Sequence, residues 1–211
     1  MKKVLRNTIT SILLSLAFLP SLASAYDPVV FVHGYLGSTL VNFTSMIAKF
    51  KAAGYPSDHL SYYTYNSING VNAGANTLKS KVDALLQKTG KSKVDIVTHS
   101  MGGLVARYYM KVKGGASKVD QIVNVATPHK GTAWAYAALG QAGKDMRPGS
   151  SVINKIKGYY PGLNLYSWCD EIVIPYWSAK VGNSKNIGCW EHIATTWSSN
   201  VISKTMAYVK P

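Results

Sequence analysis

Val94-Asp95-Ile96-Val97-Thr98-His99-Ser100-Met101-Gly102-Gly103 is the stretch that decides the fold of this chain. Its first four residues are mostly apolar and β-branched, which favours a buried strand. After the two glycines, residues 104–110 (LVARYYM) have a helical pattern. The stretch therefore predicts a strand, a sharp turn at Ser100 and a helix. Strand and helix backbones approach closely at such a turn, so small residues are expected on either side of the serine. Thr98 is bulkier than the glycine usual at its position.

Strands and helices alternate along the rest of the chain. Apolar runs predict strands over 29–32, 60–65, 94–99, 121–125 and 163–166, and near 186–187. Helical spacing predicts helices over 43–50, 78–86 and 104–110, and a closing helix after residue 193. Residues 66–76 are polar and suggest a loop, while 132–161 hold few periodic signals and suggest a small cap or an insertion. This alternation predicts an α/β fold with a mostly parallel sheet covered by helices on both faces.

The first 25 residues have the pattern of a secretory signal peptide. Lys2, Lys3 and Arg6 precede an apolar segment over 9–19, and Ala23-Ser24-Ala25 is a small-residue cleavage site. The apolar segment is too short for a membrane span, which needs about 20 apolar residues. We therefore expect a secreted protein without an integral membrane segment, whose mature chain, 26–211, is a single domain.

The net charge of +14 is strongly basic. The lysines are spread along predicted helices and are not gathered into an Arg-rich patch with interleaved aromatic residues, so nucleic-acid recognition is not expected. A solvated surface and attraction to anionic interfaces both remain open. Only nine acidic residues are present and no calcium site is evident among them. We expect a monomer without a metal or other cofactor.

The strand–serine–glycine–helix arrangement resembles the nucleophile elbow of α/β-hydrolases. A serine hydroxyl needs a histidine base, and the base needs an orienting carboxylate. Members of this superfamily carry the three residues in the order Ser, Asp or Glu, His, which leaves His129 and His192 as bases. His192 has several acids upstream after Ser100, whereas His129 has only Asp120, at the opposite edge of the sheet. We predict His192 as the base and a loop-shaping role for Pro128–Gly131.

The orienting acid is predicted to be Asp170. It follows the expected strand over 163–166 by a few residues, which places it at the edge of the sheet where ligands bind. Glu171 is the alternative. Glu191 adjoins His192 and should point away from it, and Asp145 lies in the irregular segment over 132–161.

Two cysteines flank the predicted acid and base. Cys169 precedes Asp170, and Cys189 lies three residues before His192. In an exported protein they can form a disulfide. Such a bond would tie the acid loop to the base loop, or would simply stabilise a small secreted domain, and the sequence supports both readings.

Four segments together resemble the small secreted bacterial lipases of the α/β-hydrolase superfamily: Val29–Gly34, Val94–Gly103, Asp170–Val173 and Glu191–Ile193. The resemblance implies a minimal hydrolase that cleaves triacylglycerols and simple esters through Ser100, Asp170 and His192. It also implies an oxyanion hole formed by the main-chain N–H groups of Met101 and Tyr35. Thr98 and the long 132–161 segment depart from this family's pattern, so the absence of a lid is not implied.

Several alternatives stay open. A thioesterase, an acyltransferase and a polyester hydrolase use the same three residues, and a non-catalytic hydrolase-like binding protein is less consistent with a complete set. The aromatic residues of the insertion either line an acyl pocket, meet a lipid interface or pack into the core. They are Trp134, Tyr136, Tyr159 and Tyr160.

Overall fold

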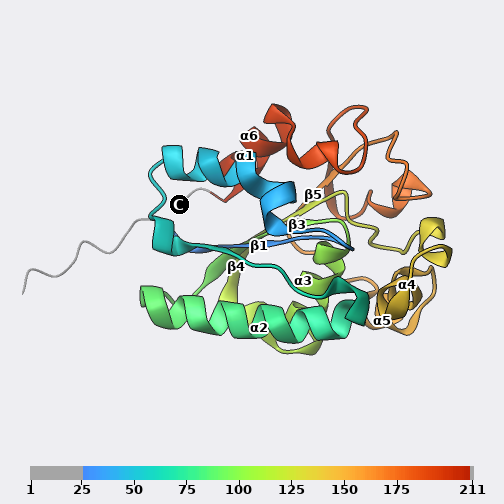
Figure 1. Cartoon of the computed structure of the whole chain (residues 1–211), viewed down its shortest axis with the longest axis horizontal. Helices are drawn as coiled ribbons and strands as arrows, with labels where there is room; N and C mark the ends of the chain where they lie inside the picture. The colour runs from blue at the N-terminus through green and yellow to red at the C-terminus, as the bar shows by residue number, and fades with distance from the viewer. Residues whose placement is uncertain (1–25, 210–211) are drawn as a thin grey trace, which may run out of the picture.

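The computed structural model describes residues 26–209, which form a six-stranded parallel sheet with helices on both faces (Figure 1). The strand order is β2-β1-β3-β4-β5-β6, and each neighbouring pair is parallel. The predicted α/β fold is therefore confirmed. The predicted signal peptide, 1–25, lies outside the described residues. The strands are β1 (Val29–Val32), β2 (Leu60–Tyr62), β3 (Val94–His99), β4 (Val119–Val125), β5 (Leu163–Tyr166) and β6 (Asn183–Asn186).

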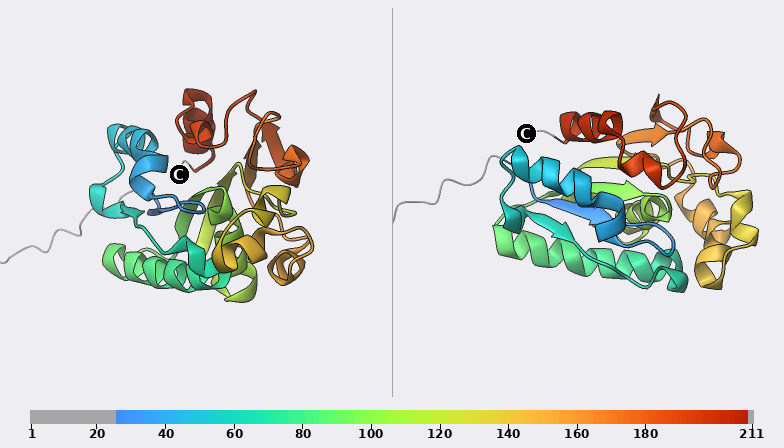
Figure 2. Two further views of the ribbon diagram at one scale, coloured as in Figure 1. Left: turned by 45° about the vertical axis from the view of Figure 1, so that its right-hand side comes forward. Right: turned by 45° about the horizontal axis from the view of Figure 1, so that its top comes forward.

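Two groups of helices cover the two faces of the sheet (Figures 1 and 2). Helices α1 (Thr39–Ala52) and α6 (Ser199–Tyr208) pack on one face, and α2 (Gly70–Thr89) and α3 (Met101–Val112) pack on the other. Because successive strand residues point to opposite faces, β1 supplies both cores. Val29 and Phe31 join the α1–α6 side, while Val30 and Val32 join the α2–α3 side. All four are fully buried, as their continuous apolar run predicts.

Helix α2 begins eight residues before the predicted start, so the loop predicted over 66–76 is wrong. A short 3₁₀ helix (Ser67–Asn69) leads directly into it. The first turns of α2 are rich in Gly, Ala and Asn and lack the apolar stripe that predicts a helix. They are helical because small residues allow close packing there: a Cβ on Gly74 would lie 2.9 Å from the side chains of Tyr65 and Val105. The carboxylate of Asp145 also accepts a hydrogen bond from Val71 N at the start of the helix (2.8 Å).

Other predicted boundaries also differ from the structure, most clearly those of β2 and α6. Strand β2 ends at Tyr62, three residues before the predicted end, and the N–H of Tyr65 donates to His33 Nε2 (3.1 Å) and not to the main chain of β1. The closing helix α6 starts at Ser199, and the segment after residue 193 is a 3₁₀ helix (Ala194–Thr196) followed by a turn at Trp197.

The 132–161 segment connects β4 and β5 and packs against the core. It contains a 3₁₀ helix (Ala133–Tyr136), α4 (Gly140–Met146) and α5 (Ser151–Ile156). Buried residues from all three, among them Ala142 and Ile156, belong to the core on the α2–α3 side. Figure 1 shows α4 and α5 at one end of the sheet, beside α2 and α3. Within residues 26–209, no helix has the length and apolar character needed to cross a membrane.

Candidate active site

Ser100 stands at the strained turn between β3 and α3. Its backbone has φ 56° and ψ −129°, and φ is positive at only three non-glycine residues of the described chain. Its N–H donates to Val125 O at 2.9 Å, which ties the turn to β4. The glycines around Ser100 are needed because a side chain would clash there. A Cβ on Gly34 would lie 2.6 Å from the Cβ of Ser100, and a Cβ on Gly102 would lie 2.3 Å from Val32 O. The geometry is that of the predicted nucleophile elbow.

Thr98 is accommodated in the elbow by a buried row of polar side chains across three strands. Its hydroxyl donates to Asn124 Oδ1 (3.0 Å), and Asn124 Nδ2 donates to Asn164 Oδ1 (3.1 Å). The three residues occupy matching register positions on β3, β4 and β5 and are fully buried. The hydroxyl of Thr98 therefore has a hydrogen-bond partner, and its side chain fills space that a glycine at this position would leave empty.

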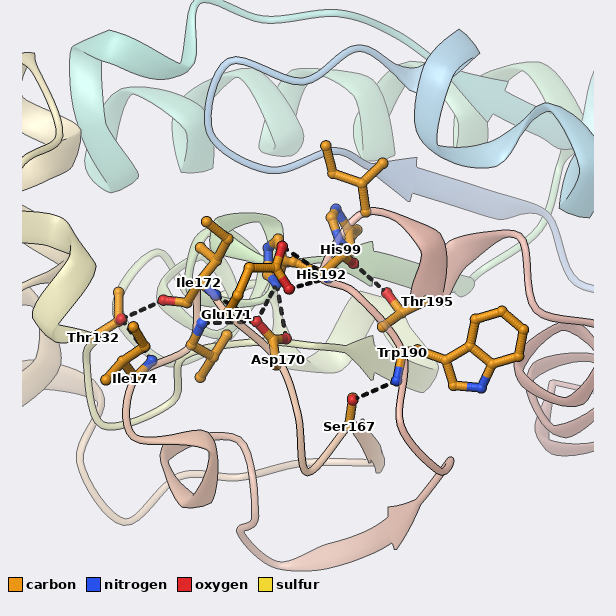
Figure 3. Close-up of polar contacts among 12 residues, drawn as sticks. His99, Thr132, Ser167, Asp170, Glu171, Ile172, Ile174, Trp190, His192 and Thr195 are labelled. Carbon is orange, nitrogen blue, oxygen red and sulfur yellow. Dashed lines mark hydrogen bonds and ion pairs between the residues drawn. The ribbon is translucent and has the colours of Figure 1, made fainter.

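Asp170 and His192 form a buried pair (Figure 3). His192 Nδ1 lies 2.9 and 3.0 Å from the two carboxylate oxygens of Asp170. Asp170 Oδ1 also accepts hydrogen bonds from the N–H groups of Ile172 (2.9 Å) and Val173 (2.8 Å). Burial acts to raise the pKa of Asp170, but the hydrogen bonds from His192, Val173 and Ile172 outweigh it and hold this pKa below its ordinary value. Asp170 therefore stays ionised and accepts a hydrogen bond from Nδ1 of the ring, so Nε2 is the ring nitrogen that does not face the carboxylate.

The alternative acids occupy other positions. Both carboxylate oxygens of Glu171 accept a hydrogen bond from the main-chain N–H of His192, at 2.9 and 3.2 Å, so Glu171 contacts the backbone of this histidine and not its ring. Asp145 caps α2, and its other oxygen accepts from Gln141 Nε2 (2.7 Å). Glu191 is exposed. Among the four acids, only Asp170 meets the imidazole of His192 (Figure 3).

Three links hold the acid loop against the base loop. Cys169 and Cys189 form the predicted disulfide, with their Cα atoms 5.1 Å apart. Ser167 Oγ accepts from Trp190 N at 2.9 Å, and the contact of Glu171 with His192 is the third link (Figure 3). The loop between β5 and β6 and the turn after β6 are therefore joined at three successive points.

An apolar cavity of about 360 Å³ opens beside these residues at the carboxyl edge of the sheet, and Ser100 and His192 both line it. Ligands of parallel α/β sheets bind at this edge. Several lining residues are strongly exposed at its mouth, among them Leu36 (65%), Val41 (57%) and Ile193 (49%). The apolar lining comes from Tyr35, Leu36, Val41, Pro128, Trp134, Met146, Ile172 and Ile193.

The family of this chain follows from its match to the family model described as "Lipase (class 2)", which covers residues 26–204. The chain belongs to the class 2 lipase family. Over 122 residues it is 32% identical to a triacylglycerol lipase of Pseudarthrobacter phenanthrenivorans, covering 54% of this chain and 36% of that protein. A triacylglycerol lipase of Burkholderia plantarii matches equally, over 54% of this chain and 32% of its own length. This class 2 lipase chain thus spans about a third of the length of these curated relatives.

Solved structures of lipases share the fold of this class 2 lipase. The mature form of Bacillus licheniformis lipase BlEst2 superposes with a TM-score of 0.72 at 16% identity, covering 89% of this chain and 94% of that one. Aspergillus fumigatus lipase B gives a TM-score of 0.70 at 18% identity, covering 83% and 52%. At such low identity the likeness shows a common α/β-hydrolase fold.

The two residues predicted to form the oxyanion hole both belong to segments that adjoin Ser100 in this class 2 lipase. Met101 is the first residue of α3, where the N–H groups have no acceptor within the helix. Tyr35 follows Gly34 in the loop after β1 and lines the cavity. Its hydroxyl accepts a hydrogen bond from Leu139 N at 2.9 Å, which ties this loop to the start of α4.

Two further buried histidines, His33 and His129, have structural partners. His33 donates through Nδ1 to Gly34 O (2.8 Å) and accepts from Tyr65 N at Nε2 (3.1 Å), so it holds the loop after β1. Burial lowers the pKa of His33, and it lowers that of His129 well below the ordinary value. The main-chain carbonyl of His129 accepts from Arg107 Nη1 at 3.1 Å, and its ring lies at the same distance from that atom. His129 thus has the loop-holding position predicted for it.

Sequence reasoning missed two polar side chains near the site, His99 and Asn42. His99 Nε2 lies 3.1 Å from the main-chain carbonyl of His192, and Nδ1 lies 3.2 Å from Asn42 Nδ2. A carbonyl requires a donor, so Nε2 carries the proton and Nδ1 accepts from the amide. Burial, and then the neighbouring His192, lower the pKa of His99 to about 3, so its ring is neutral. Within residues 26–209, no group of three His, Cys, Asp or Glu residues is arranged to hold a metal ion.

Proposed function

We propose that this chain is a secreted serine carboxylic-ester hydrolase, a triacylglycerol lipase, with Ser100 as nucleophile, His192 as base and Asp170 as orienting acid. The observation that carries the proposal is the convergence of three segments on one apolar cavity. Ser100 from the elbow and His192 from the turn after β6 line that cavity, and Asp170 from the loop after β5 pairs with His192. The family and the triacylglycerol lipases among its relatives support the same reaction class.

Each step of the reaction uses a group of this chain. His192 Nε2 removes the proton of Ser100 Oγ, which attacks the ester carbonyl. The resulting oxyanion accepts hydrogen bonds from the N–H groups of Met101 and Tyr35. The intermediate collapses to an acyl-enzyme as the imidazolium protonates the departing alcohol. Water, deprotonated by the same imidazole, then attacks the acyl group and releases the fatty acid.

A lipid surface is the proposed partner because the mouth of the cavity is apolar. Leu36, Val41 and Ile193 line it and are each about half-exposed or more. Leu40 (68% exposed) and Trp197 (52%) lie beside them, and Trp197 Nε1 donates to Val41 O at 3.0 Å. Such a rim favours contact with an aggregated substrate over a dissolved one.

The test joins covalent labelling to substrate assays. A fluorophosphonate probe should label Ser100, as located by mass spectrometry of the digested protein, and Ser100→Ala should remove both the label and the activity. Emulsified triglyceride and p-nitrophenyl esters of rising chain length, assayed beside acyl thioesters and polyester films, should give the highest kcat/KM for oxygen esters with long acyl chains. A folded wild-type protein that neither takes the label nor cleaves any ester would overturn the proposal.

A further inference from the structure

The base of the proposed triad lies in a turn outside helices and strands, and side chains from elsewhere hold both of its main-chain polar groups. The N–H of His192 donates to the carboxylate of Glu171, at 2.9 and 3.2 Å. Its carbonyl accepts from His99 Nε2 at 3.1 Å and from Thr195 Oγ1 at 2.7 Å. A catalytic residue needs its position held within about 0.5 Å, and an isolated turn does not provide that by itself.

The two distant partners are sequence neighbours of the other two triad residues. Glu171 follows Asp170, so one loop holds the ring of His192 through Asp170 and the main chain through Glu171. His99 precedes Ser100, so the elbow presents its nucleophile and holds the carbonyl of His192 with adjacent residues. The distance between Ser100 and His192 is therefore set by the hydrogen bond from His99 to the main-chain carbonyl of His192. The contact between the rings of His99 and His192 also contributes. Figure 3 shows Asp170, Glu171, His99 and Thr195 around His192.

His99 suits this role because its ring is held in one orientation and one protonation state. It is buried, and Asn42 from α1 donates to Nδ1 at 3.2 Å, which leaves Nε2 as the donor to the carbonyl of His192. The rings of His99 and His192 have centroids 4.7 Å apart. A second cation at that distance would oppose the imidazolium that forms on His192 during the reaction, so a neutral donor is required there.

We propose that Glu171 and His99 are positioning residues that clamp the main chain of His192, at its N–H and its carbonyl respectively, and so keep the base aligned with Ser100. The proposal rests on the proposed function, because it takes His192 as the base. Thr195 bonds the same carbonyl from within the turn. Removing His99 therefore leaves the carbonyl satisfied and the turn folded, but unlinks that turn from the elbow.

The experiment compares Glu171→Leu, Glu171→Gln and His99→Phe in the full mature enzyme, with Glu191→Leu as the matched control. Glu191 is an exposed carboxylate one residue before His192, so its removal changes the local charge equally without breaking the clamp. The measurements are kcat and KM on a short, dissolved p-nitrophenyl ester, the rate at which a fluorophosphonate labels Ser100, and Tm.

We expect Glu171→Leu and His99→Phe each to lower kcat and the labelling rate by about 10- to 100-fold, since small misplacements of catalytic groups cost up to about that much. KM should stay within about two-fold. Glu171→Gln keeps an acceptor oxygen for the N–H of His192, so it should restore kcat to within about three-fold of wild type. Glu191→Leu should match wild type. A downfield proton resonance from the Asp170–His192 hydrogen bond should broaden only in the clamp-breaking variants.

Three results would overturn the clamp: wild-type kcat in Glu171→Leu, equal losses in Glu171→Gln and Glu171→Leu, or an equal loss in Glu191→Leu. If His99→Phe unfolds, as its Tm would reveal, the comparison of Glu171→Leu with Glu171→Gln still tests the clamp, because Glu171 is exposed and its replacement should leave the protein folded. Failure of the proposed function is recognised separately. His192→Ala should abolish ester cleavage. A fully active His192→Ala enzyme would contradict the proposed triad. An inactive His192→Ala enzyme, together with clamp variants that keep the wild-type kcat, would refute only the clamp.

Discussion

At the scale of single residues, the buried carboxyl of Asp95 stands out because it lies far from the site. It sits at the start of β3, at the opposite edge of the sheet from Ser100, and is 3% exposed. Its Oδ1 accepts from Gln121 N at 2.9 Å. Burial raises the pKa of Asp95 to about 7, and the negative charges of Asp27 and Asp120 add to that rise.

A raised carboxyl pKa makes the stability of the fold depend on pH. The contribution of Asp95 to the free energy of unfolding is largest below about pH 4, where the carboxyl is protonated in both the folded and the unfolded state. As the pH rises from about 4 through 7, the unfolded state ionises while the folded state keeps its proton, so this contribution is lost. Asp95→Asn stays neutral and can still accept from Gln121 N. We expect its gain in unfolding free energy over wild type to grow by about 2 to 3 kcal/mol between pH 5 and pH 8.

Urea unfolding of both proteins at the two pH values measures this gain. The control is Asp120→Asn, an exposed carboxylate at the same edge whose partner is Lys93 (3.1 Å), and its effect should stay below about 1 kcal/mol at both pH values. Parallel pH profiles of Asp95→Asn and wild type would show that Asp95 is not a buried acid that ionises.

The contrast between Asp170 and Glu171 shows how far single residues can be predicted from the sequence. Chain order and the chemistry of a serine nucleophile select Asp170 and His192 as a pair, and these two side chains do meet. The same reasoning assigns Glu171 only as a substitute acid, because nothing in the sequence indicates that its carboxylate bonds a main-chain N–H. Contacts between side chains and the backbone of a distant loop leave no periodic signal.

At the scale of elements, Arg107 joins α3 to the 132–161 insertion. Its guanidinium is fully buried and donates to three carbonyls: Tyr159 O (2.8 Å), Ile156 O (2.7 Å) and His129 O (3.1 Å). It also lies over the ring of Tyr160, with a distance of 4.7 Å to the centroid. Burial lowers the pKa of Arg107 to about 10, so it remains charged near neutral pH. The carbonyl at the end of α5 carries the negative end of that helix dipole, which favours the cation.

Replacing Arg107 by Met should destabilise the protein by about 3 kcal/mol or more, because the freed carbonyls stay buried without donors. Hydrogen exchange should show lost protection in α5 while β1 and β3 keep theirs. Lys111→Met is the matched control: this exposed residue one turn later in α3 donates to Lys157 O (3.1 Å) and should cost less than about 1 kcal/mol. Equal losses in the two variants would contradict the role of Arg107.

The disulfide between Cys169 and Cys189 acts between two loops. With 20 residues separating the cysteines, loop-closure entropy gives roughly 3 kcal/mol of stabilisation. We expect the double variant Cys169→Ala/Cys189→Ala to lose about that much unfolding free energy and to inactivate faster on warming. Urea unfolding and residual p-nitrophenyl esterase activity after heating measure the two effects. Unchanged stability would mean that the bonds of Ser167 and Glu171 hold the loops without the disulfide.

Elements with an apolar pattern were predictable, and those without one were not. The runs in β1 and β3 predict buried strands, and both lie in the middle of the sheet. Strand β6, by contrast, consists of Asn183-Ser184-Lys185-Asn186 and is largely exposed at the edge, so the sequence predicts a strand only near its end, at 186–187. The start of α2 packs against Val105, and the end of α5 is held by Arg107, so both depend on tertiary contacts that leave no pattern in the sequence.

At the scale of the whole molecule, positive charge and the apolar cavity mouth should act together at a lipid surface. The net charge is +14, or 14 − 3 = +11 once Lys2, Lys3 and Arg6 of the predicted leader are removed. Such an excess attracts the protein to anionic surfaces over a distance set by salt, about 10 Å at 0.1 M and 3 Å at 1 M.

Adsorption to vesicles containing anionic phospholipid should therefore weaken several-fold between these salt concentrations. Adsorption to zwitterionic vesicles, which depends on the apolar rim, should change little, and kcat/KM on a dissolved p-nitrophenyl ester should stay constant. Sedimentation of the vesicles with bound enzyme, beside the ester assay at each salt concentration, measures both quantities. Equal salt dependence for the two kinds of vesicle would assign adsorption to the apolar rim alone and leave the lysines as a solvated surface.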